Sequence, residues 1–542
     1  MKKIITIFIL SIAFYCGQSQ TSPAWYNYAG PYNYQNYDVI NATTGVDTLG
    51  NVYTAASIYD TVAANKNAKV MLVKYNSAGI QQWIKYYVDP SDINNESYCA
   101  KILVDKSGNS YLCGYARHNT STDLDFTVIK YDNAGNQVWI GYFDGGQQTR
   151  DYLITAQFDN AGNIIIAGNT NFQGTNGYDI AVVKFGISGT MMWSYSYNNV
   201  ASNQDDNVYD IATDLNNNVY LTGNTYVTNA RNMLTIKTNS SGINQWTNIV
   251  AHTFSGSDEY GYGVIADALG NCYATGALSD WTTIKYNAGG TLVWTNHRPA
   301  SELNSTSPKH VFLDRFNNVI IASDAFYGSP NGTDLEVDKI NNSNGATIWT
   351  THYNFGGTDS YASMRKDTAD NIYIGGFFDG LQGKDISLMT LSPSGNVIWN
   401  TTFSNSNLAI GTDRSYQLVL DKSRNIIIVG SSERRGSGSS QPVDVITLKY
   451  NALAVGIKTN SLKEIQLTVY PNPCKEEFNL STTDHNLINA TISITNIIGE
   501  IVVTQKLETL TQTIDIDNLA KGIYILKITK GEEVASKRLI VE

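Results

Sequence analysis

Histidine and cysteine are the residue types best suited to acid–base, nucleophilic or metal chemistry, and their spacing here builds no known catalytic motif. The sequence has no His-Glu-x-x-His pair for zinc and no Gly-x-Ser-x-Gly turn for a nucleophilic serine. Cys99, Cys113, Cys272 and Cys474 include no Cys-x-x-Cys pair, so we expect free buried thiols and predict no catalytic residue. The histidines are His118, His252, His297, His310, His352 and His485.

Carboxylates recur at one position of an internal repeat, just before the third predicted strand of six repeat units. Such oxygen ligands are what Ca2+ requires. One carboxylate per unit leaves the ligands far apart, so we favour a role in capping the start of each strand and predict no metal site. Ca2+ is the one cofactor that the pattern leaves open. The six residues are Asp125, Asp179, Asp280, Asp334, Asp385 and Asp444.

Tyrosine and arginine in the long polar segments between strands carry the binding chemistry. Aromatic rings stack on sugar rings, and both side chains form hydrogen bonds with hydroxyl groups or with a hydrated protein surface. We therefore predict a glycan or protein ligand. The candidate binding residues are Tyr115, Arg117, Arg150, Arg298, Tyr327, Arg414 and Arg434.

The strands that position these residues follow a repeat of roughly 50 residues, which is marked by a Gly-x-x-x-Trp step. A large indole just after a tight turn can cover the hairpin and the neighbouring unit, so we interpret the tryptophans as packing residues. The steps are Gly79/Trp83, Gly135/Trp139, Gly189/Trp193, Gly242/Trp246, Gly290/Trp294, Gly345/Trp349 and Gly395/Trp399.

A second motif, Asp-x-x-x-Asn, runs in phase with the first. Asp and Asn suit a turn in which their side chains bond to nearby backbone N–H groups. Each unit then reads as four short antiparallel strands, which is typical of the blades of a β-propeller. The motifs begin at Asp47, Asp105, Asp159, Asp214, Asp267, Asp314, Asp367 and Asp421.

Eight motifs predict an eight-bladed propeller, with seven blades as the alternative. The eighth unit has a third strand but no tryptophan after it. Trp25 lies upstream of Asp47 at the spacing found in the other units. We therefore predict that the segment around Trp25 supplies the missing outer strand, beside residues 445–450, and so leaves no open edge.

The two faces of such a propeller differ in this sequence. The first-to-second and third-to-fourth turns are short and uniform, whereas the second-to-third loops and the connections between blades are long and varied. Binding residues gather in variable loops on rigid scaffolds, so we expect the functional site on the long-loop face.

The repeat resembles a bacterial β-propeller repeat family with the signature Asp-x-x-Gly-Asn-x-Tyr-x-x-Gly, matched by DKSGNSYLCG (105–114) and DALGNCYATG (267–276). This resemblance covers roughly residues 22–455 and implies the fold, but it names no function. The Gly-x-x-x-Trp step also resembles the tryptophan-docking motif of eight-bladed quinoprotein dehydrogenases.

The C-terminal segment resembles the type A C-terminal sorting domain of the type IX secretion system of Bacteroidetes. On its own terms, its alternating strands with Gly and Asn turns fit a small β-sandwich. The resemblance implies export through the outer membrane, and it implies that the secretion machinery and its C-terminal protease are partners. The motif positions are Tyr470, Pro471, Asn472, Pro473, Gly499, Gly522 and Tyr524.

The N-terminus and the composition also indicate export. Lys2 and Lys3 precede an apolar run that suits a secretory signal, and we expect cleavage after Ser19. A lipoprotein signal at Cys16 is the alternative, but Tyr15 stands where such signals need a small residue. No later run is apolar enough to cross a membrane. A net charge of -11 argues against nucleic acid.

These observations predict four parts: a signal peptide (1–19), a β-propeller (20–451), a linker (452–463) and a sorting domain (464–542). We expect an extracellular or outer-membrane surface protein that acts as a binding scaffold rather than as an enzyme. The alternative left open is a carbohydrate-active or quinone-dependent enzyme with its active site at the propeller axis.

Overall fold

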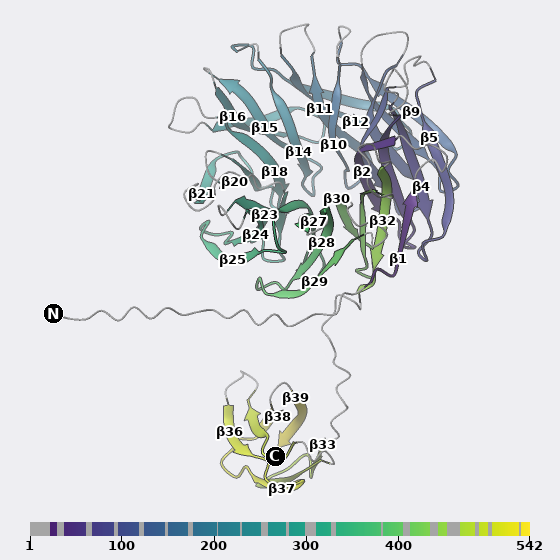
Figure 1. Ribbon diagram of the computed structural model, residues 1–542. Helices are drawn as coiled ribbons and strands as arrows, with labels where there is room; N and C mark the ends of the chain where they lie inside the picture. Colours follow the sequence, from purple (N-terminus) through teal and green to yellow (C-terminus); the bar gives the residue numbers. More distant parts are fainter. Residues whose placement is uncertain are drawn as a thin grey trace, which may run out of the picture. The chain divides into compact units, whose positions relative to one another are not determined.

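The protein is all-β, and every regular element that its computed structural model describes is a strand (Figure 1). The chain divides into two compact units, Met1–Val455 and Gly456–Glu542. The predicted boundaries of signal peptide, propeller, linker and sorting domain stay predictions. The described residues are 22–29, 37–60, 68–90, 96–118, 124–146, 150–171, 177–202, 204–227, 230–250, 258–277, 281–298, 310–326, 332–380, 383–404, 412–433, 443–452, 467–482, 487–496, 501–530 and 533–542.

Eight four-stranded antiparallel sheets make up the N-terminal unit, and we number them sheets 1 to 8 in chain order. Sheets 1 to 4 contain β2 (Tyr37–Val46), β3 (Val52–Asp60), β4 (Ala68–Tyr75) and β5 (Gln81–Tyr87); β6 (Ser97–Val104), β7 (Ser110–Ala116), β8 (Asp125–Tyr131) and β9 (Gln137–Phe143); β10 (Tyr152–Phe158), β11 (Ile164–Thr170), β12 (Asp179–Phe185) and β13 (Met191–Tyr197); and β14 (Asn207–Thr213), β15 (Val219–Val227), β16 (Ala230–Thr238) and β17 (Asn244–Val250).

Sheets 5 to 8 repeat this order, except that the last sheet takes one strand from the start of the chain. They contain β18 (Tyr260–Ala266), β19 (Cys272–Ala277), β20 (Trp281–Tyr286) and β21 (Leu292–Arg298); β22 (His310–Leu313), β23 (Val319–Phe326), β24 (Thr333–Ile340) and β25 (Thr347–Tyr353); β26 (Asp359–Lys366), β27 (Ile372–Gly380), β28 (Gly383–Leu391) and β29 (Val397–Phe403); and β30 (Asp413–Leu420), β31 (Ile426–Glu433), β32 (Val443–Tyr450) and β1 (Trp25–Ala29).

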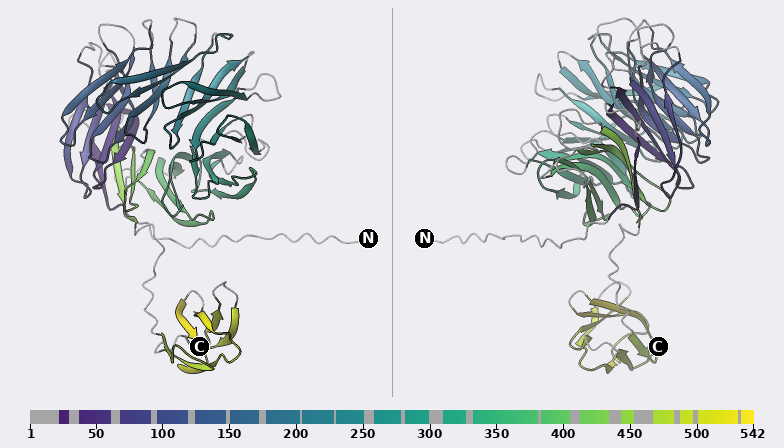
Figure 2. Two further views of the ribbon diagram at one scale, coloured as in Figure 1. Left: turned by 180° about the vertical axis from the view of Figure 1, so that it is seen from behind. Right: turned by 45° about the vertical axis from the view of Figure 1, so that its right-hand side comes forward.

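The sheets follow one another around a common centre, in a propeller-like arrangement (Figures 1 and 2). The first strand of each sheet lies innermost and contacts the first strand of the next sheet, and β2 of sheet 1 also contacts β30 of sheet 8. Between neighbouring sheets lie separate hydrophobic clusters, such as the one that joins β3 and β4 to β31 and β32. Burial between the sheets therefore holds the unit together.

The strand exchange predicted for Trp25 is present. β1 pairs antiparallel with β32, and Trp25 lies opposite Lys449. In sheets 1 to 6 the tryptophan likewise lies opposite the lysine of the third strand, for example Trp83 opposite Lys74. Because β1 pairs along the outer edge of β32, that edge is covered and sheet 8 has four strands like the other sheets.

The repeated indoles lie on the next sheet rather than on their own. Seven of them donate the indole N–H to a backbone carbonyl of the next third-to-fourth turn, as Trp139 Nε1 does to the Ile187 oxygen at 3.1 Å. The ring then covers the glycine of that turn. A Cβ built on Gly189 would lie 2.6 Å from the Trp139 ring, and Gly189 has φ +88°, so the turn needs glycine for both reasons. The seven docked indoles are Trp25, Trp83, Trp139, Trp193, Trp246, Trp294 and Trp349.

Trp399 departs from the predicted repeat. It lies opposite Thr390 rather than a lysine, and its ring packs against Tyr450 of sheet 8 with centroids 5.8 Å apart. The fourth strand of sheet 8 comes from the start of the chain, and the residues that follow Ala452 after β32 lie outside the described residues. Trp399 is buried in the cluster between sheets 7 and 8. It therefore packs between sheets as predicted.

The Asp-x-x-x-Asn turns form one repeated hydrogen-bond set. Asp47 Oδ1 accepts the N–H groups of Leu49 and Asn51, and Asn51 Nδ2 donates to Asp47 Oδ2 at 2.7 Å. The other seven motifs repeat these bonds. These carboxylates serve the fold.

The Oδ2 atom of this aspartate has a second partner, which differs between sheets. Where the sixth residue after the aspartate is tyrosine, the phenol donates to the carboxylate, as in Tyr220 Oη to Asp214 Oδ2 at 3.0 Å. Where the sixth residue is isoleucine, the lysine of the third strand takes the place of the phenol, as in Lys184 Nζ to Asp159 Oδ2 at 2.7 Å. In sheets that have the tyrosine, this lysine can instead donate to a backbone carbonyl of the next turn, as Lys237 Nζ does to the Ala288 oxygen at 3.0 Å.

The four cysteines of the described residues are buried and form no disulfide, as predicted. Lys101, and not Cys99, lies opposite Cys113. Burial raises the pKa of the Cys99 thiol to about 12, so it stays protonated and unreactive at neutral pH.

The C-terminal unit has a three-stranded sheet in the order β33-β34-β37 and a four-stranded sheet in the order β36-β35-β38-β39. Both contribute to one core that includes Phe478, Ile492 and Leu526. The strands are β33 (Leu467–Tyr470), β34 (Glu477–Thr482), β35 (Thr491–Thr495), β36 (Ile501–Lys506), β37 (Thr511–Asp515), β38 (Gly522–Lys530) and β39 (Glu533–Val541).

A single hairpin offers a matched test of the indole–glycine contact. We expect Gly189→Ala to lower the free energy of unfolding by about 2–4 kcal/mol, because alanine meets both an unfavourable φ and the Trp139 ring. Gly186→Ala in the same turn should cost less than about 0.5 kcal/mol, since its Cβ would lie at ordinary contact distance. Calorimetric unfolding of both variants measures the difference, and equal losses would contradict the docking role.

Candidate functional site

Five tyrosines form a continuous chain on the long-loop face, and we call them the tyrosine arc: Tyr59, Tyr98, Tyr115, Tyr152 and Tyr178. They lie at strand ends of sheets 1 to 3, or just before a strand in the case of Tyr178. Successive ring centroids are 6.0, 4.9, 5.4 and 5.7 Å apart. The arc therefore crosses two boundaries between sheets as one aromatic surface.

The rings of the arc are half-buried, so each keeps part of its surface for a ligand. Tyr98 and Tyr115 are stacked with an interplanar angle of 25°, and the hydroxyls of Tyr59 and Tyr98 are hydrogen-bonded at 3.1 Å. A small pocket lined by Tyr98, Tyr115 and Thr127 has room for about one water molecule. The arc is thus a surface for stacking rather than a deep cavity.

Charged groups lie next to the arc. Arg117 forms an ion pair with Glu96. Arg150 is exposed, and a hydrogen bond with Tyr152 raises the pKa of its guanidinium. Burial raises the pKa of Tyr115 to about 12, so its hydroxyl stays neutral and can both donate and accept at neutral pH.

A second aromatic group continues along the same face in sheets 4 and 5. Tyr260 and Tyr262 are stacked with centroids 5.7 Å apart, and Tyr209 lies 5.3 Å from Tyr262. Arg231 and Asp258 form a partly exposed ion pair beside Tyr260, at 3.0 Å. The combination of tyrosine, arginine and carboxylate recurs there.

The structure brings three of the predicted binding residues together and separates two others. Tyr115, Arg117 and Arg150 lie at the arc. Arg298 Nη1 binds the carboxylates of Glu336 and Asp338, the latter at 2.9 Å, and lies over Trp281. Arg414 lies over Phe377 with its guanidinium carbon 5.9 Å from the centroid. The two predicted residues Tyr327 and Arg434 lie outside the described residues.

One of the aspartates that precede the third strands, Asp125, lies close to two other carboxylates. In the described part of the chain, one group of three carboxylates could hold a cation: Asp125, Asp144 and Asp151, with one oxygen of each within 4.8 Å of the others. Asp151 already accepts the Gly145 N–H at 2.7 Å and a bond from the Thr170 hydroxyl. These bonds give Asp151 a role in the fold, and the absence of a metal site stays a prediction, with Ca2+ as the one cofactor left open. Asp280 is outside the described residues.

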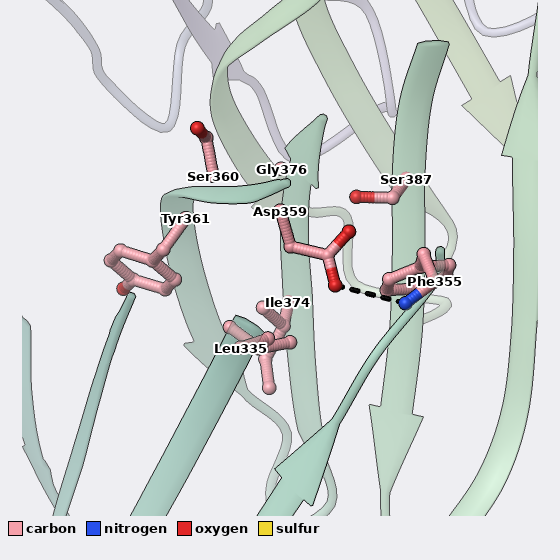
Figure 3. Close-up of a pocket in the computed structure, with 8 residues that line it drawn as sticks. All are labelled: Leu335, Phe355, Asp359, Ser360, Tyr361, Ile374, Gly376 and Ser387. Carbon is pink, nitrogen blue, oxygen red and sulfur yellow. Dashed lines mark hydrogen bonds between the residues drawn. The ribbon is translucent and has the colours of Figure 1, made fainter. Parts of the chain in front are cut away.

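A buried carboxylate in sheet 7 lines a small pocket with room for about one water molecule (Figure 3). Asp359 Oδ2 accepts the Phe355 N–H at 2.9 Å, while its Oδ1 is buried without a hydrogen-bond partner. Burial, together with the nearby carboxylates of Asp334 and Asp324, raises the pKa of Asp359 to about 7. This residue is a source of pH-dependent stability.

Sequence reasoning missed most of the tyrosine arc because it searched the loops. Tyr98 and Tyr152 lie at the starts of inner strands, each seven residues before the repeated aspartate. Tyr260 occupies the same position in sheet 5. Counting back from the motif would have found all three, since the repeat places this position at one end of every sheet.

The predicted sorting motif lies in the C-terminal unit. Tyr470 ends β33 and is 48% exposed, and the Asn472 side chain bonds to the backbone of Arg538 and Ile540. Gly522 begins β38, and the buried Tyr524 donates to the Ala520 carbonyl at 2.7 Å. Pro471 and Pro473 each follow a cis peptide bond. Gly499 lies outside the described residues.

Residues 468–542 match the family of secretion system C-terminal sorting domains. Such a domain implies interaction with the type IX secretion machinery, and it indicates export to the cell surface or the extracellular space, as the sequence predicts. No curated protein matches the chain. No helix long and apolar enough to span a membrane occurs in the described residues.

Several solved structures are similar at low identity. PorZ, an essential surface component of the type-IX secretion system of Porphyromonas gingivalis, is 9% identical, with 95% of this chain and 100% of PorZ covered and a TM-score of 0.28. Sqt1 of Chaetomium thermophilum is 8% identical, with 78% and 96% covered and a TM-score of 0.48. The polysaccharide lyase Uly1 is 10% identical, with 81% and 94% covered and a TM-score of 0.41. Such scores carry no functional argument, and membership of the predicted repeat family stays a prediction.

Asp359 predicts a measurable pH effect. Between about pH 4 and 7 the folded state holds a proton that the unfolded state has lost, so stability falls as the pH rises through this window. Asp359→Asn removes this loss, and we expect its advantage in Tm over the native chain to grow by about 1–3 °C between pH 4 and 8. Glu477→Gln, which changes an exposed carboxylate of the C-terminal unit, is the control. Parallel Tm profiles for D359N and the native chain would refute the assignment.

Proposed function

We propose that this protein is an eight-bladed β-propeller that binds glycans at the cell surface or in the extracellular space after type IX secretion. The observation that carries the proposal is the tyrosine arc, with Arg117, Arg150 and Glu96 beside it. Rings that are half-buried lose little conformational freedom on binding and present flat faces to sugar rings. Neighbouring charged groups can bond to the sugar hydroxyls.

The sheet count and the strand exchange at β1 support the propeller. The short-turn ends of the sheets are occupied by the Asp-x-x-x-Asn bonds and by the docked indoles, so variation there disturbs the fold. The long-loop ends carry the arc and the second tyrosine group. Both observations therefore favour a binding site on the long-loop face.

An axial enzyme is the second candidate, and it remains a prediction. Hydrolysis of glycosides uses a pair of carboxyl groups a few ångströms apart. At the centre of the sheets, the charged groups that interact with Asp210 are the cations Lys101 and Arg365. This set suits anion binding better than acid–base catalysis, so we favour the binding scaffold.

A glycan array with the full chain tests the binding face. We expect Tyr98→Ala and Tyr152→Ala each to weaken binding about tenfold through loss of stacking, and Tyr98→Phe to keep most of it. Lys106→Ala on the opposite face is the control. Binding that survives both alanine variants but is lost in K106A would place the site on the short-turn face. Binding to proteins but not to glycans would show that the ligand is a protein.

Sorting is tested separately. We propose that the secretion system's C-terminal protease removes the sorting domain during surface anchoring or release. Deletion of residues 467–542 should leave the N-terminal unit folded, with an unchanged Tm, but retained in the periplasm. Fractionation and immunoblotting of the native and truncated chains measure this. Normal surface delivery of the truncated chain would overturn the sorting role.

A further inference from the structure

In several inner strands, the side chain at one position accepts a hydrogen bond from the backbone of the neighbouring sheet. Each inner strand pairs on one side only, so N–H groups on its free edge need acceptors. In four sheets, a polar side chain at the fourth residue before the repeated aspartate supplies one, whereas sheet 5 has Gly263 there. Gln417 Oε1 accepts the Thr44 N–H at 2.8 Å, Thr43 Oγ1 the Ile102 N–H at 3.3 Å, and Ser363 Oγ the Leu418 N–H at 3.1 Å.

Asp210 fills the same position in sheet 4 and performs the same task. Its Oδ2 accepts the Val264 N–H of the next inner strand at 3.0 Å. In sheet 2 the position holds Lys101, which follows the bulge of β6 as Asp210 follows the bulge of β14. An ammonium group has three donors and no acceptor, so Lys101 cannot satisfy the next strand. The structural role of the position does not explain this residue.

Lys101 meets two charged residues from distant sheets. It interacts electrostatically with Asp210 of sheet 4 and with Arg365 of sheet 7, and Arg365 also interacts with Asp210. Sheets 2, 4 and 7 are not neighbours, so their side chains come within reach of each other only around the common centre (Figures 1 and 2). The three residues therefore form one central group.

The central group carries an excess of positive charge inside an acidic protein. Two cations face one carboxylate, whereas the net charge of the chain is -11. All three side chains keep part of their surface accessible. Arg365 donates to the Met364 carbonyl at 2.6 Å and lies over Phe312, contacts that occupy only part of its five N–H donors. Donors thus remain for a ligand.

We propose that Lys101 and Arg365 form an oxyanion-binding site at the centre of the N-terminal unit. The ligand is a carboxylate, sulfate or phosphate group, which the two cations bind through charge-assisted hydrogen bonds. Asp210 holds the neighbouring strand and limits the affinity by repelling the anion. This site is separate from the tyrosine arc and does not rest on the proposed glycan binding.

Lys101 titrates near neutral pH, which gives the site a pH signature. Burial, together with the positive charge of Arg365, lowers the pKa of Lys101 to about 8. The groups that face it are Arg365 on β26, Asp210 on β14, and the thiols of Cys99 on β6 and Cys113 on β7. Anion binding needs the protonated ammonium, so affinity falls as the pH rises through 8.

Calorimetric titration of the full chain with sodium sulfate and, separately, with sodium glucuronate tests the proposal. We expect Lys101→Met and Arg365→Met each to weaken binding about tenfold or more. Asp210→Asn keeps an acceptor for Val264 and should tighten binding about threefold to tenfold. Lys106→Met, which removes an exposed lysine of a short turn, should change nothing. Tm values equal to or above that of the native chain show that a loss of binding is not a loss of folding.

The pH dependence of binding distinguishes a lysine that binds the anion from a lysine with only a structural role. Affinity of the native chain should fall about tenfold from pH 7 to 9, while Lys101→Arg should bind with a flat profile, because arginine stays charged. Tighter binding of glucuronate than of sulfate would identify an acidic sugar as the source of the oxyanion, and the reverse would identify a free inorganic anion. Absence of saturable binding to either, or equal binding by the native chain and K101M, would overturn the proposal.

Discussion

The N-terminal unit depends on one contact between sheets, an indole lying on the glycine turn of its neighbour. A four-stranded sheet has two faces to bury and cannot do so alone, so each sheet must be attached to the next. The indole covers the turn, its N–H satisfies a turn carbonyl, and the lysine opposite it reaches the same turn or the aspartate beside it. The same contact therefore buries apolar surface and provides hydrogen bonds for the polar groups of the turn.

This contact also explains the strand exchange at the chain ends. Sheet 8 would lack a fourth strand and an indole without β1, and sheet 1 would lose the partner of its glycine turn. A Cβ on Gly79 would lie 2.6 Å from the Trp25 ring, so the first turn is shaped to receive it. On the other side of sheet 8, the Trp399 ring packs on Tyr450. Docking between sheets 8 and 1 thus fixes where the N-terminal strand must lie.

The features that recur were predictable from the sequence, and those that occur once were not. The tryptophans, the aspartate turns and the place of β1 follow from spacing, because the same contact is made again and again. Tyr115, Arg117 and Arg150 were found because they flank long polar segments, but Tyr59, near the end of β3, was not, since no motif marks its contact with Tyr98 of the next sheet. Arg298 resembled a binding residue, yet its carboxylate partners come from sheet 6, which no local pattern indicates.

A residue that departs from the repeat indicates a function that the repeated residues do not show. At the position that Lys101 occupies, Thr43, Ser363, Gln417 and Asp210 each accept an N–H group from the free edge of the next strand. A lysine there gives up that bond and places a desolvated ammonium beside a second cation, which costs stability in the absence of an anion. A residue that is unfavourable for the fold at a position where neutral alternatives work in three other sheets is best explained by what it binds.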